Sequence, residues 1–367
     1  MKLAALTSVP LQLPFRVEFT GASASRSAGY SAWVRATDTT GLRGYGESCP
    51  RHYVTGEDLD SVQAFFDRHH RSWLRIDWGV DRLRQWTDDH ATQINADPAA
   101  WAGVELALLD LLAKHDGQDV EALLGLRPLS GEFSYSAVLG DSSMETFAEQ
   151  FQRYRKLGFD DYKIKLSGDA CRDRNKFAIL NEYESIRVRA DANNLWSDPH
   201  RAIEYLQRLE YRFWALEEPL AAGDIAGLRQ LATALDTRVV LNESALRVGQ
   251  LRLLAADAAR WLINLRISKM GGLLRSMALA DAARQHGIEV IVGAHVGETS
   301  VLSRAALVVA HYARRGVAAQ EGAFGTHLLH RDICASPVMF GAGGRLQAER
   351  LAGAGRPGWG IEPDRFT

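Results

Sequence analysis

The sequence predicts an α/β protein with a closed barrel of the (β/α)₈ type that follows an α+β block. From about Glu132 onward, short apolar strands alternate with amphipathic helices, a pattern typical of parallel βαβ units. Equivalent positions of the second to the seventh strand recur about every 24 to 27 residues, as a barrel requires. The first 125 or so residues show no such repeat and therefore form a unit of another kind.

The N-terminal block is predicted to consist of strands followed by two or three helices. The clearer helix has Asp97 as a good N-cap and Pro98 at its first helical position. Its apolar side chains recur at helical spacing. The elements expected in order are strands over Leu3–Leu13 and Ser31–Thr37, a turn from Gly41 to Glu47 that leads into a further strand, and helices over Thr55–Leu74 and Asp97–His115.

The repeating part predicts eight strands and the helices that connect them. The expected strands are Phe133–Val138, Asp161–Lys165, Ile186–Asp191, Phe213–Glu217, Arg238–Asn242, Leu262–Arg266, Ile288–Val292 and Val317–Gln320. The expected helices are Met144–Leu157, Arg174–Glu184, Pro199–Leu209, Ile225–Leu235, Val248–Ala256, Leu274–His286 and Ser300–Arg314.

A doubly wound sheet is the alternative architecture, but no GxGxxG motif follows the first strand. We therefore divide the chain into residues 1–128, 129–330 and 331–367. The last part is Gly-rich and carries no further repeat, so it is expected either to return to the N-terminal block or to fray.

Several predicted barrel strands end in polar or charged residues, at the end where barrel enzymes place their active sites. Asp191, Glu217 and the pair Asn242-Glu243 hold the same place in consecutive βα units, 26 and 25 residues apart. Three adjacent strands then direct oxygen ligands at one point, a donor set that favours Mg²⁺ over Zn²⁺. The alternative is that these acidic residues only cap the helices that follow.

Lys163 and Lys165 are two residues apart and therefore share one face of their strand. Two neighbouring ammonium groups disfavour each other's charge, which is expected to lower the pKa of a lysine toward neutrality and make it a usable base. The alternative is a solvated pair that faces outward, but the outer face of a barrel strand is covered by helices.

Five segments, taken in order, resemble the enolase superfamily, and more narrowly its muconate-lactonizing-enzyme subgroup, which includes muconate cycloisomerases, o-succinylbenzoate synthases and dipeptide epimerases. The resemblance covers nearly the whole chain. It is carried by Lys163-Ile164-Lys165, Arg189-Ala190-Asp191-Ala192-Asn193, Leu216-Glu217-Glu218-Pro219, Asn242-Glu243-Ser244 and Lys269-Met270-Gly271-Gly272, with Tyr45-Gly46-Glu47 fitting the N-terminal domain of that family.

The resemblance implies a modified (β/α)₇β TIM barrel, an N-terminal α+β capping domain and a C-terminal segment that rejoins the cap. It implies Mg²⁺ held by Asp191, Glu217 and a fifth-strand residue, with Asn242 favoured over Glu243. A lysine would remove the proton α to a metal-bound carboxylate and give an enediolate. By position, Lys165 is the implied base and Lys163 the neighbour that tunes it.

One departure from the subgroup concerns the overall reaction. Arg266 stands where the subgroup usually has a second lysine, and Lys269, three residues on, is not taken as its replacement. Because arginine stays protonated, it can stabilise an enolate but is a poor base. We therefore expect a one-base reaction, a cycloisomerase or a lyase acting on a small carboxylate. The alternatives are an amino-acid or dipeptide epimerase and a non-catalytic ligand-binding barrel.

Four further residues are predicted to contact the substrate. His295 ends the seventh strand, and Glu321 follows the eighth. The resemblance implies that specificity comes largely from the capping domain, so the segment from Phe15 to Arg26 is expected to be a loop that closes over the barrel mouth. Arg16 or Arg26 could bind a distal anion there, although both could equally be solvated.

Composition excludes several classes of function. With 43 basic and 45 acidic residues the net charge is −2, so no basic excess predicts binding to nucleic acid or to an acidic membrane. The three cysteines are widely spaced and predict no disulfide framework, which favours a reducing, cytoplasmic compartment. We see no signal peptide and no membrane span. The resemblance implies a homo-oligomer of unspecified size.

Overall fold

The computed structural model describes residues 1–21 and 24–364, and its centre is the predicted barrel. Eight parallel strands pair in sequence order from β5 to β12. The two outer strands of this order meet where Ser136 N donates to Gln320 O at 2.9 Å. The strands are β5 (Ala137–Leu139), β6 (Asp161–Lys165), β7 (Arg187–Asp191), β8 (Ala215–Glu217), β9 (Arg238–Leu241), β10 (Trp261–Leu265), β11 (Glu289–Val292) and β12 (Val317–Gln320).

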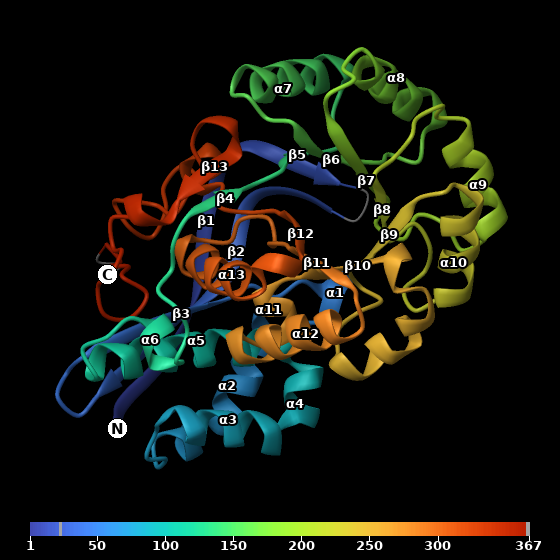
Figure 1. The fold of residues 1–367 in the computed structure, drawn as a ribbon. Helices are drawn as coiled ribbons and strands as arrows, with labels where there is room; N and C mark the ends of the chain where they lie inside the picture. Colours follow the sequence, from blue (N-terminus) through green and yellow to red (C-terminus); the bar gives the residue numbers. More distant parts are fainter. Residues whose placement is uncertain (22–23, 365–367) are drawn as a thin grey trace.

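Helices surround the barrel, as the green to orange ribbons of Figure 1 show. Several begin at a side chain that accepts a hydrogen bond from the first turn, a common helix N-cap; examples are Ser143, Asp169, Asp198 and Asp224. The helices are α7 (Met144–Lys156), α8 (Ala170–Asn181), α9 (Pro199–Gln207), α10 (Ile225–Ala234), α11 (Ile267–Met270), α12 (Leu273–Gln285) and α13 (Ser300–Tyr312).

Strand alternation divides the barrel residues between two apolar clusters. One cluster packs the strands against the surrounding helices and continues into the N-terminal domain. The other takes one residue from each of five adjacent strands: Ala215, Val240, Leu262, Ile291 and Ala319. Polar side chains lie further along several of these strands, at the ends where the chain leaves the barrel. The apolar cluster inside the barrel therefore lies beneath the polar side chains at the ends of the strands.

The N-terminal domain is a three-stranded antiparallel sheet followed by helices. Trp73, Trp86 and Trp101 stack or tilt against one another and are buried. Its elements are β1 (Leu3–Gly21), β2 (Ala24–Asp38), β3 (Arg43–Ser48), α1 (His52–Thr55), α2 (Leu59–Trp73), α3 (Val80–Asp89), α4 (Ala91–Ala96), α5 (Pro98–His115) and α6 (Val120–Leu123).

The expected loop over the barrel mouth is instead a β-hairpin. β1 continues to Gly21 and β2 begins at Ala24, and Phe19 pairs with Arg26. Residues 22 and 23 of the predicted loop lie outside the described residues. β1 contains prolines at positions 10 and 14. They are tolerated because β1 is an edge strand, where a missing N–H leaves no partner unpaired.

Three other predicted elements differ in the structure. The helix expected from Thr55 to Leu74 begins only at Leu59, as α2, because Asp58 forms a capping box with Ser61, while Thr55 ends the separate helix α1. The helix expected over Val248–Ala256 becomes two 3₁₀ helices, Val248–Leu253 and Ala255–Arg260. The strand expected over Phe133–Val138 becomes β4 (Glu132–Ser134) and β5, since β4 pairs with β13 (Arg345–Gln347) outside the barrel.

The C-terminal segment contacts the N-terminal helices, as the red ribbon of Figure 1 indicates. Trp359 is buried, and its indole Nε1 donates to Leu106 O of α5 at 3.2 Å. Its backbone N donates to Asp110 Oδ1 at 2.8 Å. Gly358 N donates to Gln118 O at 2.9 Å, just before α6. Residues after the barrel therefore help to hold the N-terminal helices in place.

Glu105 of α5 joins the N-terminal domain to the barrel. Its carboxylate is fully buried and accepts hydrogen bonds from the backbone N–H groups of Leu273 and Leu274 at the start of α12. Burial raises the pKa of Glu105 to about 8, against the partial compensation of these hydrogen bonds. The neutral acid is therefore the form that the folded protein favours.

Glu105→Gln is expected to change how stability depends on pH. A carboxyl whose pKa rises from 4.5 to about 8 on folding contributes stability below pH 4.5 and loses it as the pH rises through 8. The variant keeps a neutral group, so its free energy of unfolding should fall less between pH 5 and 8, by an amount on the order of a few kcal/mol. Denaturant unfolding of both proteins measures this, and parallel pH profiles would contradict it.

Candidate active site

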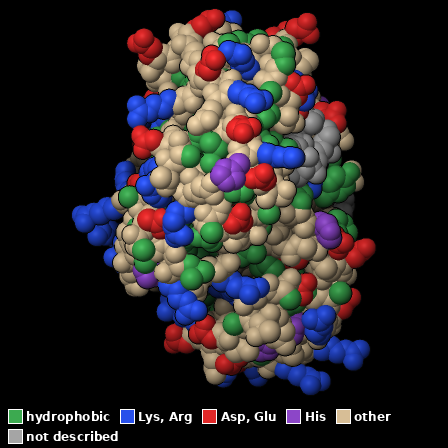
Figure 2. Space-filling model, turned by 90° about the vertical axis from the view of Figure 1, so that its right-hand side faces the viewer, with side chains coloured by type: hydrophobic (Ala, Val, Ile, Leu, Met, Phe, Trp, Pro, Cys, Tyr) green, Lys and Arg blue, Asp and Glu red, His purple; other side chains and the backbone are tan. Residues whose placement is uncertain are grey.

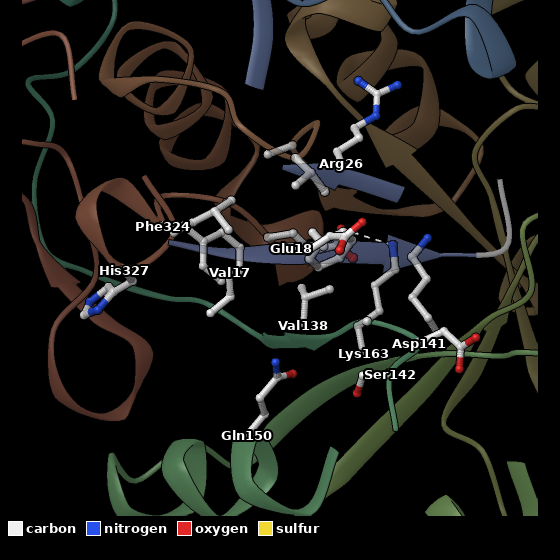
Figure 3. Close-up of a pocket in the computed structure, with 18 of the residues that line it drawn as sticks. Val17, Glu18, Arg26, Val138, Asp141, Ser142, Gln150, Lys163, Phe324 and His327 are labelled. Carbon is white, nitrogen blue, oxygen red and sulfur yellow. Dashed lines mark hydrogen bonds and ion pairs between the residues drawn. The ribbon is translucent and has the colours of Figure 1, made fainter. Parts of the chain in front are cut away.

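A cavity of about 600 Å³ opens at the C-terminal ends of the barrel strands, beneath the β1–β2 hairpin. Figure 3 shows Arg26 of the hairpin on one side, Gln150 of α7 on the other, and Lys163 between them. Six of the residues predicted from the sequence line this cavity: Arg26, Lys163, Lys165, Arg266, His295 and Glu321.

The other predicted residues do not line the cavity. Asp191, Glu217 and Asn242 are buried at the ends of their strands, at most 1% exposed. Arg16 is turned toward the loop after β12, where its Nε donates to Thr326 O at 2.8 Å and Leu329 O at 3.1 Å. Its guanidinium ties the hairpin to the barrel, and its role toward a substrate stays a prediction.

The ammonium of Lys163 lies among three carboxylates. Its Nζ is 2.6 Å from Glu217 Oε2, 2.9 Å from Asp191 Oδ2 and 3.2 Å from Glu321 Oε2. The parallel register of β6, β7 and β8 brings Asp191 and Glu217 side by side, because Lys165 pairs with Asp191 and Asp191 pairs with Glu217. Buried Arg189 holds the other oxygen of Glu321 at 2.9 Å.

The pKa of Lys163 moves opposite to the direction expected from two adjacent lysines. Burial acts to lower it, but the charges of Asp191, Glu217 and Glu321 outweigh burial and raise the pKa above its usual value. The prediction of a lysine tuned toward neutrality is therefore wrong for Lys163. Lys163 is instead a positive charge fixed by these carboxylates. Because it lies two residues from Lys165, the two side chains share one face of β6.

Lys165 reaches the cavity from the next inward position of β6. Its Nζ lies 2.6 Å from Asp191 Oδ2 and 2.6 Å from Asn193 Oδ1, and its side chain is 12% exposed. Sequence reasoning assigned no role to Asn193. Its φ of 47° is a left-handed conformation that asparagine tolerates better than most residues, and the Asn193-Asn194 pair directly after a strand was the signal for it.

Arg266 lies on the far side of Glu217. Its Nη2 is 3.3 Å from Glu217 Oε1, which also accepts a hydrogen bond from Asn264 Nδ2 at 2.9 Å. Burial opposes the charge of Arg266, but Glu217, Glu321 and Glu243 outweigh it and raise the pKa of the guanidinium. Arg266 is therefore a permanent cation that lines the cavity.

His295 is buried beside Glu298 and Cys49. The three offer ligand atoms within 4.8 Å of one another, and neither His295 ring nitrogen has a hydrogen-bond partner. Burial, then the charges of Arg266 and Arg51, holds the pKa of His295 well below its usual value. The imidazole is therefore neutral, while the nearby guanidinium groups disfavour a bound cation.

The residues predicted to hold Mg²⁺ provide a suitable set of donors. Asp191 and Glu217 offer carboxylate oxygens, and the ammonium of Lys163 already occupies a cation position between them. Within the described ranges, Asp191, Glu217 and Glu243 do not bring three oxygens within 4.8 Å of one another. A hard divalent cation fits this donor chemistry.

Residues 146–367 match the model of the family described as enolase C-terminal domain-like. The chain is 27% identical to the N-succinyl-L-Arg/Lys racemase of Bacillus cereus over 314 residues, 84% of each protein. It is 30% identical to the L-Lys-D/L-Arg epimerase of Methylococcus capsulatus over 289 residues, 77% of this chain and 79% of that protein. A crystal structure of a dipeptide epimerase from Methylococcus capsulatus, in complex with Mg and the dipeptide L-Arg-D-Lys, superposes with a TM-score of 0.83 at 27% identity, covering 98% of this chain and 99% of that one.

Proposed function

The chain belongs to the enolase superfamily, and we propose that it removes the proton α to the carboxylate of an N-acylated amino acid or a dipeptide, with Mg²⁺ bound. The observation that carries the proposal is the position of Lys165. Its amino group lines the cavity and lies 2.6 Å from Asp191, one of the candidate metal ligands. Removal of a proton α to the substrate carboxylate requires a base next to the metal ion that binds this carboxylate.

Each charged group has a separate task in this proposal. Lys165 takes the α-proton from one face of the substrate. Lys163, held as an ammonium by Asp191, Glu217 and Glu321, stabilises the negative charge that develops on the substrate carboxylate. Asp191 and Glu217, with a residue that follows β9, would hold Mg²⁺, which when bound supplies Lewis-acid stabilisation of the enediolate.

The relatives favour an amino-acid derivative as the substrate. The relatives of this chain include an N-succinyl-L-Arg/Lys racemase and several epimerases named for amino acids or dipeptides. An o-succinylbenzoate synthase at 28% identity is also among them. The cavity lining supports a polar substrate, because it includes charged groups of both signs, such as Arg26, Arg153, Asp141 and Glu149. The initial expectation of a cycloisomerase or lyase therefore becomes the second candidate.

Arg266 is the reason to retain a cycloisomerase or lyase reaction as the second candidate. Racemisation in two steps needs a group on each face that can both take and give a proton. A guanidinium whose pKa is raised by Glu217, despite burial, does not take one. A reaction that uses Lys165 alone, such as cycloisomerisation or syn elimination, meets no such obstacle.

The proposal is tested by incubating the protein with Mg²⁺ in D₂O and libraries of dipeptides, N-acylamino acids and muconate-like acids, read by mass spectrometry. We expect a mass gain of one unit in the amino-acid derivatives. Label confined to the muconate-like acids would support the second candidate instead. No label in any compound, with Mg²⁺ binding confirmed by calorimetry, would contradict α-proton removal from these substrate classes.

Arg266→Lys is expected to open the second face of the substrate. Lysine can exchange its proton where arginine does not, so the variant should exchange the α-proton of both enantiomers at comparable rates. The wild type should exchange one enantiomer at least about tenfold faster. Proton NMR in D₂O on each pure enantiomer measures the two rates. Equal rates in the wild type would contradict the assignment of Arg266.

The apolar character of the helices and the distribution of surface charge bear on whether the protein binds a membrane or nucleic acid. None of the described helices combines the length and apolar character needed to cross a bilayer. The face in Figure 2 shows acidic and basic side chains interspersed, without a broad basic area. A cytoplasmic location and a homo-oligomeric state stay predictions.

A further inference from the structure

We infer that Glu243, and not Asn242, completes the metal site. This inference rests on the proposed function, because it concerns the Mg²⁺ that the reaction requires. Asn242 was the favoured ligand on sequence grounds, since it holds the place of the residue that follows Asp191 and Glu217 in the series of strand ends. The hydrogen bonds around it use its amide in another way.

Both atoms of the Asn242 amide are engaged. Its Oδ1 accepts a hydrogen bond from Lys269 Nζ at 3.1 Å, and its Nδ2 donates to Glu243 Oε1 at 3.0 Å. These partners orient the amide, because its oxygen faces the amino group of Lys269 and its NH₂ group faces a carboxylate oxygen. The only side-chain oxygen of Asn242 is therefore already engaged by Lys269.

Lys269 is held firmly in this place. It is buried, and its Nζ also donates to Asn242 O at 2.7 Å and to Asn264 O at 2.5 Å. Three acceptor oxygens thus surround the amino group. Releasing Asn242 Oδ1 for a metal would take one of these acceptors from a buried donor, which is unfavourable.

A carboxylate at position 242 could satisfy both demands, because one oxygen could face Lys269 while the other faces a metal. An amide cannot do this, since the atom opposite its oxygen is an NH₂ donor, which repels a cation. An amide at this position therefore offers a metal neither a free ligand oxygen nor a negative charge.

Glu243 offers the free oxygen that Asn242 lacks. Its Oε1 is fixed by the Asn242 amide, while its Oε2 is buried without a hydrogen-bond partner. Glu243 is 8% exposed, and besides burial the charges of Arg266, Asp191 and Glu217 act on its carboxylate. A buried carboxylate oxygen without a hydrogen-bond donor is best satisfied by a cation.

Two nearby candidates are excluded by their contacts. The carboxylate of Glu218 accepts hydrogen bonds from Asn242 N, Ser244 N and Ser244 Oγ, at 2.6 to 3.0 Å, so both its oxygens are used. Asn264 also has an unpaired Oδ1, but this oxygen lies against the backbone of Gly293 on the neighbouring strand. Glu243 is left as the third donor.

The test is binding of Mg²⁺ and of Mn²⁺ to the substrate-free protein, by calorimetry and by electron paramagnetic resonance. Glu243→Gln should weaken binding more than about 100-fold, beyond the 10–100-fold typical of an outer-shell partner. Asn242→Ala should weaken it by less than about tenfold, and Asn242→Asp should strengthen it. Glu105→Gln is the matched control, because Glu105 is also a buried carboxylate with one unpaired oxygen but lies in α5, away from the barrel mouth, and it should bind as the wild type does.

The inference is overturned if Asn242→Ala weakens binding as much as Glu243→Gln, or if Glu243→Gln leaves it unchanged. Circular dichroism and the melting temperature of each variant identify loss of fold, and the conservative Asn242→Asp change keeps the comparison available. α-Proton exchange by the wild type is a separate readout. If exchange occurs but Glu243→Gln still binds metal, only this inference fails; if the wild type binds no divalent cation, the proposed function fails as well.

Discussion

Lys165→Ala is expected to abolish α-proton exchange while the protein still folds and binds Mg²⁺. The amino group of Lys165 reaches the cavity, and removal of a general base costs about 10²–10⁴-fold in rate. Lys163 cannot take over, because the charges of Asp191, Glu217 and Glu321 outweigh its burial and raise its pKa. The rate of deuterium uptake from D₂O, followed by NMR on the best substrate from the library, measures the loss.

The matched control for this change is Lys156→Ala. Lys156 is an exposed lysine at the end of α7, so its removal should leave the exchange rate within about twofold. Mg²⁺ affinity of Lys165→Ala should remain measurable, since Asp191 and Glu217 are intact. Exchange by Lys165→Ala at more than about a tenth of the wild-type rate would show that another group is the base.

Asp191→Asn is expected to have the second large effect, a loss of Mg²⁺ affinity of more than about 100-fold. The carboxylate is buried, and burial alone would raise its pKa, but Lys163 and Lys165 outweigh burial and hold the pKa far below its usual range. It is therefore charged at any pH of interest. The amide removes this charge and one oxygen from the donor set, and hard cations depend on both. Calorimetric titration with Mg²⁺ measures the change.

Asp198→Asn serves as the control for the Asp191 change. Asp198 caps α9 through a hydrogen bond to His200 N, and asparagine caps a helix about as well as aspartate. Both fold and Mg²⁺ affinity should therefore be unchanged. An Asp191→Asn protein that binds Mg²⁺ as tightly as the wild type would place the metal elsewhere.

The barrel and the contents of its mouth could be predicted from the sequence because both follow local rules. Strand and helix periods appear within short windows, and parallel pairing then brings equivalent strand ends together. Lys165, Asp191 and Glu217 hold consecutive places in the register, as their spacing indicated. The enolase superfamily, named from five motifs, is confirmed by the family match over residues 146–367.

Features that depend on distant partners could not be predicted in this way. β4 separates from β5 because its partner, β13, lies about 200 residues later in the chain. The pKa of Lys163 is raised against burial by Asp191 and Glu217, and also by Glu321, which comes from the other end of the barrel sequence. The orientation of the Asn242 amide depends on Lys269, whose position follows from the short helix α11 that no periodicity indicated.

Under the proposed function, the overall reaction depends on Arg266. Racemases and epimerases are among the relatives of this chain, yet Arg266 lines the cavity as a permanent cation. The geometry therefore supports enolisation from the face of Lys165 and not from that of Arg266.

The most direct test of the central claim is the rate of α-proton exchange in D₂O for each enantiomer of one substrate, with Mg²⁺ present, in the wild type and in Lys165→Ala. We expect the wild type to exchange one enantiomer at least about tenfold faster than the other, and the variant to exchange neither at a comparable rate. Exchange of the same enantiomer at an undiminished rate in Lys165→Ala would contradict the claim that Lys165 removes the α-proton.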